Sequence, residues 1–372
     1  MNYLNKTVLL VTCFVLIQAC KKDAAPAPKE DAINTIPEFF KPSPRSSYGE
    51  NQPKVLELAG PNSGLMRPTD LDFNPGRSDE LWVVNEDFVN TGGSTIMFTG
   101  ISTGNPKADH RRDGNAWHFM SMPTGIAFGD NGFWATSPGI LDANHQNGSF
   151  TGPALWSADL NVYAQPSGGN GSHMDMLHGS PYSMGIAWER DNVYWVTDGF
   201  NGYLVMYDFR NDHGAGNSNH DDGIIHRYGG ISFKRIEGVP SHLEIDDKRE
   251  FLYMVDNGNS RVLKIDLRSK ERLSSLPLRN EVLADHASYK ADYSVFSEDQ
   301  VQQYCGIALN GDRVFLSDHK TGTILCIHAQ SGEELGRVET GIEGITGLVV
   351  DKNNRLYFVS YTESALYQLQ PQ

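Results

Sequence analysis

The sequence predicts an all-β fold, a six-bladed β-propeller whose N-terminal strand closes the last blade. Three observations lead to this prediction: a strand-like segment that recurs six times, a second segment at a nearly constant distance before each copy, and one strand-like segment left over near the N-terminal end. The composition agrees, because 37 glycines and 18 prolines in 372 residues are typical of a chain rich in turns and poor in long helices.

The recurring segment is five residues long. It is rich in β-branched and aromatic residues, and its last residue is Asn, Asp or Ser. Such a run is typical of a buried strand that enters a turn. The six copies end at Asn85, Ser137, Asp198, Asp256, Asp318 and Ser360. We therefore expect each copy to be the second strand of one blade.

A shorter segment precedes each of these ends by 13 to 16 residues, which is the length of two short strands and a turn. Its copies begin at Thr69, Thr124, Met184, Ser241, Cys305 and Thr346. In four repeats a third segment begins six residues after the polar residue. Short strands that repeat every 40 to 60 residues, roughly, describe the blades of a propeller.

The last repeat supplies only three strands, while Lys54-Val55-Leu56-Glu57-Leu58 is a strand-like segment ahead of the first repeat. If this segment is the outer strand of the last blade, the ring closes without a free edge. The predicted propeller spans residues 52–372.

Residues 1–19 have the pattern of a secretory signal peptide, with one positive charge, an apolar run and a small residue at the end. The ending Leu16-Ile17-Gln18-Ala19-Cys20 resembles a bacterial lipobox, in which Cys20 receives lipid on its sulfur and becomes the mature N-terminus. The Lys21-Lys22-Asp23 that follows is similar to lipoproteins of Bacteroidota. The alternative is an ordinary secretory signal with an incidental cysteine. Residues 20–51, rich in Pro, Ala and Ser, are expected to form a flexible tether.

These features predict an extracytoplasmic protein anchored through Cys20 to a bacterial membrane, the outer membrane being the expected one. The formal net charge of −15 would repel nucleic-acid phosphates and anionic lipid, so we exclude a nucleic-acid partner and expect membrane contact through the lipid alone. Cys305 and Cys326 fall on the first and third strands of one blade. Their backbones should be too far apart for a disulfide, which needs Cα atoms within about 7 Å.

In a propeller, the connections into the first strands and the turns after the second strands crowd one mouth of the central channel. Asp198, Asp256 and Asp318 end three second strands and should lie around that mouth. They could hold a divalent cation, because hard cations prefer oxygen ligands. The alternative is that each carboxylate accepts hydrogen bonds within its own turn.

Three side chains recur at one repeat position. His118, His178 and Arg235 each lie six residues before the start of a first strand, and His242 follows the last of these starts. If the connections fold over the mouth, His118, His178 and His242 could converge as ligands of a transition metal or as catalytic acid and base. The alternative places them on outer strands, in solvent and without a role.

Two insertions interrupt the repeats. Residues 212–223 follow the third strand of blade 3 and carry His213 and His220, which could clip a calcium ion or a transition metal; a solvated loop is the alternative. Residues 138–153, together with 165–182, are expected to overhang the mouth as a lid or a recognition surface.

Two motifs resemble NHL repeats: Pro123-Thr124-Gly125-Ile126-Ala127 followed by Trp134, and the run from Tyr253 to Val262. The resemblance covers about residues 52–372 and implies a six-bladed propeller, a scaffold that serves hydrolases, lyases and binding modules. The NHL-type peptidyl-hydroxyglycine amidating lyase holds zinc with histidines on Pro-His-Gly-like first strands. The equivalents in this chain, Pro123-Thr124-Gly125 and Pro240-Ser241-His242, have Thr and Ser at the ligand position.

A looser similarity to calcium-dependent lactonase propellers rests on Asp and Asn at the blade turns. We therefore expect a lipid-anchored binding module that takes a small molecule or an extracytoplasmic protein at its mouth. The alternative is a metal-assisted lyase or hydrolase at the same mouth, with calcium or zinc as its cofactor.

Overall fold

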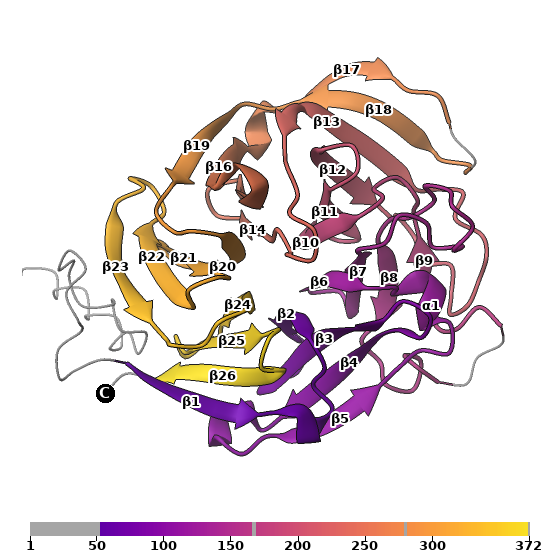
Figure 1. Cartoon of the computed structure of the whole chain (residues 1–372). Helices are drawn as coiled ribbons and strands as arrows, with labels where there is room; N and C mark the ends of the chain where they lie inside the picture. Colours follow the sequence, from indigo (N-terminus) through magenta and orange to yellow (C-terminus); the bar gives the residue numbers. More distant parts are fainter. Residues whose placement is uncertain (1–52, 166–168, 279–280, 371–372) are drawn as a thin grey trace, which may run out of the picture. The chain divides into compact units, whose positions relative to one another are not determined.

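The computed structural model describes residues 53–165, 169–278 and 281–370. The described strands form six sheets, which are the blades of a β-propeller arranged around a channel (Figure 1). The predicted signal peptide, the predicted lipidation site Cys20 and the predicted tether lie outside the described residues.

Blades 1 to 3 follow one another along the chain. Their strands, from the channel outward, are β2 (Pro68–Phe73), β3 (Glu80–Phe88), β4 (Gly92–Thr99) and β5 (Lys107–Arg111) in blade 1; β6 (Pro123–Phe128), β7 (Phe133–Pro138), β8 (Ala154–Ser157) and β9 (Asp175–Met176) in blade 2; and β10 (Ser183–Arg190), β11 (Val193–Asp198), β12 (Tyr203–Asp208) and β13 (Ile224–Ser232) in blade 3.

Blades 4 to 6 have the same order, and short helical turns connect some of the strands. The strands are β14 (Leu243–Asp246), β15 (Phe251–Asp256), β16 (Arg261–Asp266) and β19 (Tyr293–Glu298) in blade 4; β20 (Tyr304–Asn310), β21 (Arg313–Asp318), β22 (Thr323–His328) and β23 (Glu334–Glu339) in blade 5; and β24 (Ile345–Val350), β25 (Leu356–Ser360), β26 (Ala365–Gln370) and β1 (Lys54–Ala59) in blade 6. The helical turns are α1 (Ala116–Phe119), η1 (Pro61–Ser63), η2 (Ile101–Thr103), η3 (Asn257–Asn259) and η4 (Leu267–Ser269).

The N-terminal strand closes the last blade, as the sequence predicts. β1 pairs antiparallel with β26, from Lys54 opposite Gln370 to Ala59 opposite Leu366. The innermost strands then contact one another in a closed cycle, in the order β2, β6, β10, β14, β20, β24 and again β2. The two ends of the propeller are therefore held together by backbone hydrogen bonds within one sheet.

One excursion departs from the predicted repeat. After β16 the chain leaves blade 4 and adds β17 (Glu271–Ser275) and β18 (Asp285–Lys290) to the outer side of blade 3, where β18 runs parallel to β13. It then returns as β19, the outer strand of blade 4 (Figure 1). The sequence does not predict β17, because all five of its residues are exposed and they show no alternation of apolar and polar residues.

Glycine allows the innermost strands to pack closely. Gly125, Gly185, Gly306 and Gly347 each directly follow one of the first-strand starts predicted from the sequence and are the third residues of β6, β10, β20 and β24, next to the neighbouring blade. A Cβ atom on Gly185 would lie 2.3 Å from the Ser241 carbonyl oxygen of the next blade. Blades 1 and 4 have Asp70 and His242 at this position, so these are the two blades whose first strands carry a charged or titratable side chain there.

Three tryptophans at one position of the second strands lie in the core clusters of the propeller. Trp82, Trp134 and Trp195 are fully buried, so they pack in the core and offer no stacking surface. Cys305 and Cys326 are buried and are not joined in a disulfide, as expected, because β21 separates their strands. In the part of the chain that the structure describes, no helix is long and apolar enough to cross a membrane.

Candidate functional site

A pocket of about 390 Å³ lies at the mouth of the channel, between the connections that lead into the first strands. Thr69, Thr124 and Met184, three of the predicted first-strand starts, contribute to its wall. Gly139 and Ile140 of the blade 2 insertion also line it, so this part of the insertion does reach the mouth. The wall is mainly apolar, with a few polar side chains, which is the usual character of a small-molecule site.

Arg235 gives this pocket a positive charge. Its guanidinium group lies over the ring of Tyr182, with the Cζ atom 3.9 Å from the ring centroid. Among the described residues, no carboxylate lies within 4.0 Å of the Arg235 side chain, although most other arginines of the propeller have such a partner. Both side chains line the pocket, so the guanidinium is available to a ligand there.

The opposite wall of the pocket carries a carboxylate that is already neutralised. Glu86 accepts a hydrogen bond from the hydroxyl of Tyr361 and forms an ion pair with Arg67, at 3.5 Å. Its side chain is 12% exposed. Arg235 and Glu237 are then the two charged side chains that line the pocket without an ion pair among the described residues, and Arg235 is the less exposed of the two.

Asp198, Asp256 and Asp318 accept hydrogen bonds close to their own turns. Asp198 accepts from the backbone N–H groups of Phe200 and Asn201, and Asp318 accepts from four backbone N–H groups. Asp256 accepts from the backbone N–H of Lys234 and from two side chains. These bonds fit the turn interpretation. A metal role for the three carboxylates stays a prediction without support from the geometry, because none belongs to a described group of three ligand atoms within 4.8 Å.

His242 lies in the channel rather than beside His118 and His178. Its Nε2 atom donates to the Thr69 carbonyl oxygen at 3.1 Å, and its Nδ1 atom lies 3.3 Å from Oδ2 of Asp70, which belongs to the blade on the opposite side of the ring. Both residues line a second pocket, further along the channel. Burial raises the pKa of Asp70 to about 8 and lowers that of His242 to about 4. At neutral pH the protonated Asp70 can therefore donate to Nδ1 of a neutral His242.

His118 and His178 do lie close together, away from His242. Their ring centroids are 6.5 Å apart. His118 belongs to α1, and His178 lies in the connection between β9 and β10. Two of the three predicted histidines therefore lie close together in the structure. Further side chains that the sequence did not point to lie near them.

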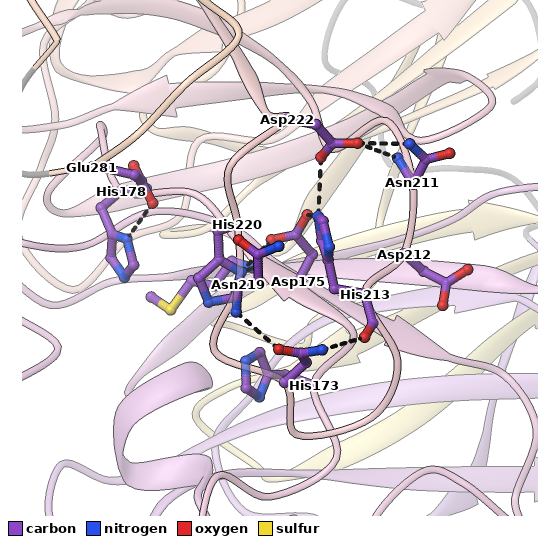
Figure 2. A network of polar contacts seen from close by, with 12 residues as sticks. His173, Asp175, His178, Asn211, Asp212, His213, Asn219, His220, Asp222 and Glu281 are labelled. Atoms are coloured by element: carbon purple, nitrogen blue, oxygen red, sulfur yellow. Dashed lines mark hydrogen bonds and ion pairs between the residues drawn. The ribbon is translucent and has the colours of Figure 1, made fainter.

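These neighbours surround Asp175, a buried residue of β9 at the outer edge of blade 2. His213 and His220, from the predicted metal-clip insertion of blade 3, both approach its carboxylate (Figure 2). Oδ1 of Asp175 lies 2.6 Å from Nδ1 of His220, and Oδ2 lies 3.8 Å from Nε2 of His213. The insertion is therefore fastened to the preceding blade through Asp175 and does not extend freely into solvent.

Asp175, His213 and Asp222 form a group that could hold a metal ion, with one ligand atom from each within 4.8 Å of the others. His213 Nε2 lies 3.0 Å from Asp222 Oδ1, and Asp222 also accepts from the side chain of Asn211 (Figure 2). The predicted metal residue His213 belongs to this group, whereas His220 contacts it through Asp175. Asp175 and Asp222 were not predicted, because nothing in their local sequence shows that two blades meet there.

Four histidines of this region have one ring nitrogen in a hydrogen bond to an oxygen acceptor. His118 Nδ1 bonds to the carbonyl of Ala143, His173 Nδ1 to that of Asn170, and His178 Nδ1 to the carboxylate of Glu281. His220 Nδ1 bonds to Asp175. His173 was missed by the sequence analysis. It stands two residues before Asp175 in a segment rich in His, Met and Gly, which is the one local signal that could have drawn attention to it.

No protein-family model matches the chain, and no curated protein matches its sequence. Solved structures match its fold. An auxiliary nutrient binding protein from Bacteroides thetaiotaomicron aligns with a TM-score of 0.55 and 10% identity, over 86% of this chain and 76% of that one. A luciferin-regenerating enzyme aligns with a TM-score of 0.51 and 12% identity, over 86% of this chain and 95% of that one.

A protein of unknown function from Bacteroides thetaiotaomicron aligns with a TM-score of 0.50 and 10% identity, over 87% of this chain and 72% of that one. At these identities the likeness concerns the fold. The protein is therefore a six-bladed β-propeller, of a fold found both in binding proteins and in an enzyme. Its particular role has to be argued from its own side chains.

Proposed function

We propose that this protein is a ligand-binding β-propeller that takes a small organic anion, a carboxylate with an apolar body, in the pocket at the mouth of its channel. The observation that carries the proposal is the guanidinium of Arg235, which lines the pocket, lies over Tyr182 and has no carboxylate partner among the described residues.

The geometry favours a carboxylate over a cation or a neutral ligand. A guanidinium group that stacks on an aromatic ring keeps its N–H edge free, and that edge matches the two oxygens of a carboxylate. Met122, Ile140 and Met184 line the same pocket and would contact an apolar body of the ligand. Glu86 does not compete for Arg235, because it is already paired with Arg67 and Tyr361.

The proposal includes the predicted location. We infer that a lipid on Cys20 and the tether of residues 20–51 hold the propeller outside the cytoplasm, at the outer membrane. A role in capturing a ligand there is supported by the similar fold of a protein described as an auxiliary nutrient binding protein. Labelling of the full chain with a radioactive fatty acid, and loss of the label in Cys20→Ala, would test the anchor.

Ligand binding can be tested by thermal shift with a panel of mono- and dicarboxylic acids of four to ten carbons, each added to the full chain. A ligand at 100 times its dissociation constant stabilises the fold by about 2.7 kcal/mol. We expect at least one acid to raise the melting temperature of the wild type, and we expect Arg235→Gln to abolish the shift.

Arg190→Gln is the matched control, because the side chain of Arg190 is 59% exposed and lies at the end of β10. This variant should keep the shift. A panel without any stabilising acid, or a shift that Arg235→Gln retains in full, would count against an anion site at the mouth.

A metal-assisted lyase or hydrolase is a second candidate function, and one observation favours it. A pocket of about 370 Å³, lined by His178, His220, Asp221 and Glu281, opens beside the buried carboxylate of Asp175. A catalytic metal needs such an open side for water or substrate. Hydrolysis of nitrophenyl esters and lactones by the full chain, with and without added zinc, would test it. Zinc-dependent turnover that Asp175→Asn removes would support this reading, and equal rates with and without zinc would exclude it for these substrates.

A further inference from the structure

We propose that His118, His173, His178 and His220 together hold one divalent transition metal of the zinc type at the outer edge of blades 2 and 3. The site is separate from the pocket at the channel mouth. This proposal does not depend on the anion site, nor on whether the metal supports a reaction.

The hydrogen bonds fix which nitrogen of each ring is free. Carbonyl and carboxylate oxygens can only accept, so the Nδ1 atoms that contact Ala143, Asn170 and Glu281 must carry the proton. Nδ1 of His220 has two contacts, Asp175 Oδ1 at 2.6 Å and the N–H of Met176 at 3.4 Å, and the much shorter contact with the carboxylate favours the proton on Nδ1 there as well. In a neutral imidazole the other nitrogen, Nε2, then has a lone pair and no hydrogen. All four rings therefore present the same metal-binding atom.

Two of these lone pairs are buried without a hydrogen-bond partner. Nε2 of His173 and Nε2 of His178 are among the buried polar atoms that no described donor contacts. His173 is fully buried, and the side chain of His178 is 7% exposed. An unpaired buried polar atom is costly, and two in one cluster call for a shared partner such as a metal ion.

The four rings form one connected cluster. The ring centroids of His118 and His178 are 6.5 Å apart, and those of His173 and His220 are 5.7 Å apart. Besides burial, which is the larger cause, His118 and His220 both lie near enough to His173 to lower its pKa, and His220 does the same for His178, so each ring has two others as neighbours. Zinc–nitrogen bonds of about 2.0–2.1 Å put two rings on one zinc ion at centroid separations of roughly 5–6 Å. Among the described residues, no three of these histidines have ring nitrogens that all lie within 4.8 Å of one another, so the rings have to move toward one another for a single ion to reach all four.

The rings are held in place by contacts of the kind that surround metal ligands. A carboxylate orients His178 through Glu281 and orients His220 through Asp175 (Figure 2). Such carboxylate–histidine pairs fix the ring and raise its basicity at zinc sites. Aromatic rings add to this, because Phe119 stacks on His173 at 3.5 Å and Phe150 stacks on His178 at 3.4 Å between centroids.

Burial favours the neutral form of three of the four imidazoles. Burial lowers the pKa of His118 and His178, and it lowers that of His173 to about 4. Neutral imidazole is the form that binds a metal, and a set of nitrogen ligands selects zinc, copper, nickel or iron over calcium and magnesium.

The neighbouring group of Asp175, His213 and Asp222 is the competing location. There, the nitrogen of His213 nearest the carboxylates is already in a hydrogen bond with Asp222, at 3.0 Å, and Asp222 is also bonded to Asn211. A metal would have to break these bonds, whereas Nε2 of His173 and Nε2 of His178 have no hydrogen bond to lose. Asp175 then acts as a positioning residue, because its Oδ1 atom holds the ring of His220.

The experiment measures metal content and affinity of the full chain. Protein purified without chelators would be assayed for zinc, copper, nickel, iron and calcium, then stripped and titrated with Zn²⁺ by calorimetry and with Co²⁺ by absorption spectroscopy. We expect one transition metal per chain, and Co²⁺ bands typical of nitrogen ligation.

Single alanine variants at His118, His173, His178 and His220 should each weaken Zn²⁺ binding at least 100-fold, and Glu281→Gln should weaken it about 10- to 100-fold by releasing the ring of His178. His328→Ala is the matched control, because this partly exposed histidine at the end of β22 lies in blade 5, away from the cluster, and its ring bonds to Ser331. It should leave the affinity unchanged. His118 and His220 are only partly buried, so their variants carry the test if His173→Ala does not fold.

Three results would overturn the proposal. One is the absence of any transition metal that binds with a stoichiometry near one. Another is preference for Ca²⁺ over Zn²⁺. The third is a loss of affinity in Asp222→Asn with unchanged affinity in His118→Ala and His220→Ala, which would place the metal in the Asp175, His213 and Asp222 group.

Discussion

At the scale of single residues, the same side chain type serves different purposes according to which blade carries it. Aspartate ends the second strands of blades 3, 4 and 5, where it accepts hydrogen bonds from its own turn. Aspartate on the first strand of blade 1 reaches across the channel to His242. Residue type and repeat position therefore have to be read together before a carboxylate is assigned a role.

If Asp256 serves to hold its turn, its replacement by Ala should destabilise the fold and leave the metal content of the protein unchanged. Its buried carboxylate accepts hydrogen bonds from Lys234, Asn259 and Arg261. Asp256→Ala leaves these donors unpaired and should lower the free energy of unfolding by about 3 kcal/mol. Urea denaturation would measure this, with the exposed Asp130→Ala as a control that should change little. Loss of bound metal in Asp256→Ala, at unchanged stability, would instead favour a cation site at the turn.

The carboxyl group of Asp70 predicts that stability falls as pH rises. Its pKa is about 8 in the fold, because of burial, and 3.8 without it, so the folded state binds the proton more tightly and loses stability as pH rises between these values. Asp72, raised to about 7, acts in the same direction. His242, lowered from 6.5 to about 4, acts in the opposite direction but only below pH 6.5. Above pH 6.5 the effect of the buried carboxyl groups therefore remains, and Glu244, whose pKa is also raised by burial and by Asp72 and Asp70, acts in the same direction.

Asp70→Asn should remove much of this slope, because the amide does not ionise. For the wild type, the loss attributable to Asp70 from pH 6.5 to 8 is about 2 kcal/mol. Urea unfolding at several pH values would measure it, with Asp130→Asn as the control that keeps the wild-type slope. An unchanged slope in Asp70→Asn would mean that this carboxyl is ionised in the fold.

At the scale of elements, the first strands are shaped by the closeness of their neighbours. Gly306 of β20 lies beside β24, and a Cβ atom on it would be 2.4 Å from the Thr346 carbonyl oxygen. Gly306→Ala should therefore force the two blades apart and cost about 1–3 kcal/mol. The control is Gly230→Ala, in the outer strand β13, because a Cβ atom there would meet nothing within 4 Å. Thermal denaturation of both variants would decide; equal melting temperatures would mean that the ring can relax around a Cβ atom.

The elements that the sequence predicts well are those that repeat. A second strand such as Tyr194 to Asp198 is buried on both faces, so its apolar run and its polar end are dictated by packing and can be recognised six times. β17 and β18 obey no such rule, because they cover the outside of blade 3 only once. The histidine cluster escaped prediction for a related reason. His118, His178 and His220 are brought together by α1, a connection and an insertion, and no local pattern encodes that meeting.

At the scale of the whole propeller, closure of the ring is the feature on which both sites depend. The mouth pocket is lined by residues from several blades, among them Thr69 of the first and Tyr361 of the last. Those two blades meet because β1, from the N-terminal side, completes the sheet that β24, β25 and β26 begin. The ring is thus held shut by a single strand pairing, in contrast to a closure that shares several strands.

This closure predicts different fates for two truncated chains. A chain that begins at residue 53 lacks the predicted tether and keeps β1, so it should melt at the temperature of the full chain. A chain that begins at residue 60 lacks β1, which exposes the backbone edge of β26 and uncovers apolar residues that Val55 and Leu58 contact. An unpaired edge invites association with other chains. We expect this second chain to melt about 10 °C lower or more, and to elute as aggregates from size-exclusion chromatography.

Because the two chains differ only by residues 53–59, a difference in their melting temperatures can be attributed to β1 and not to the loss of the tether. Addition of a synthetic peptide with the sequence of residues 53–59 provides a further check, since a free strand can pair with the open edge of β26 and restore part of the lost stability. A chain beginning at residue 60 that stays monomeric and melts with the full chain would show that contacts between the first strands alone hold the ring closed. Loss of stability that the peptide restores would show that the pairing of β1 with β26 holds the ring closed. The mouth pocket, which the closed ring forms, would then depend on this pairing as well.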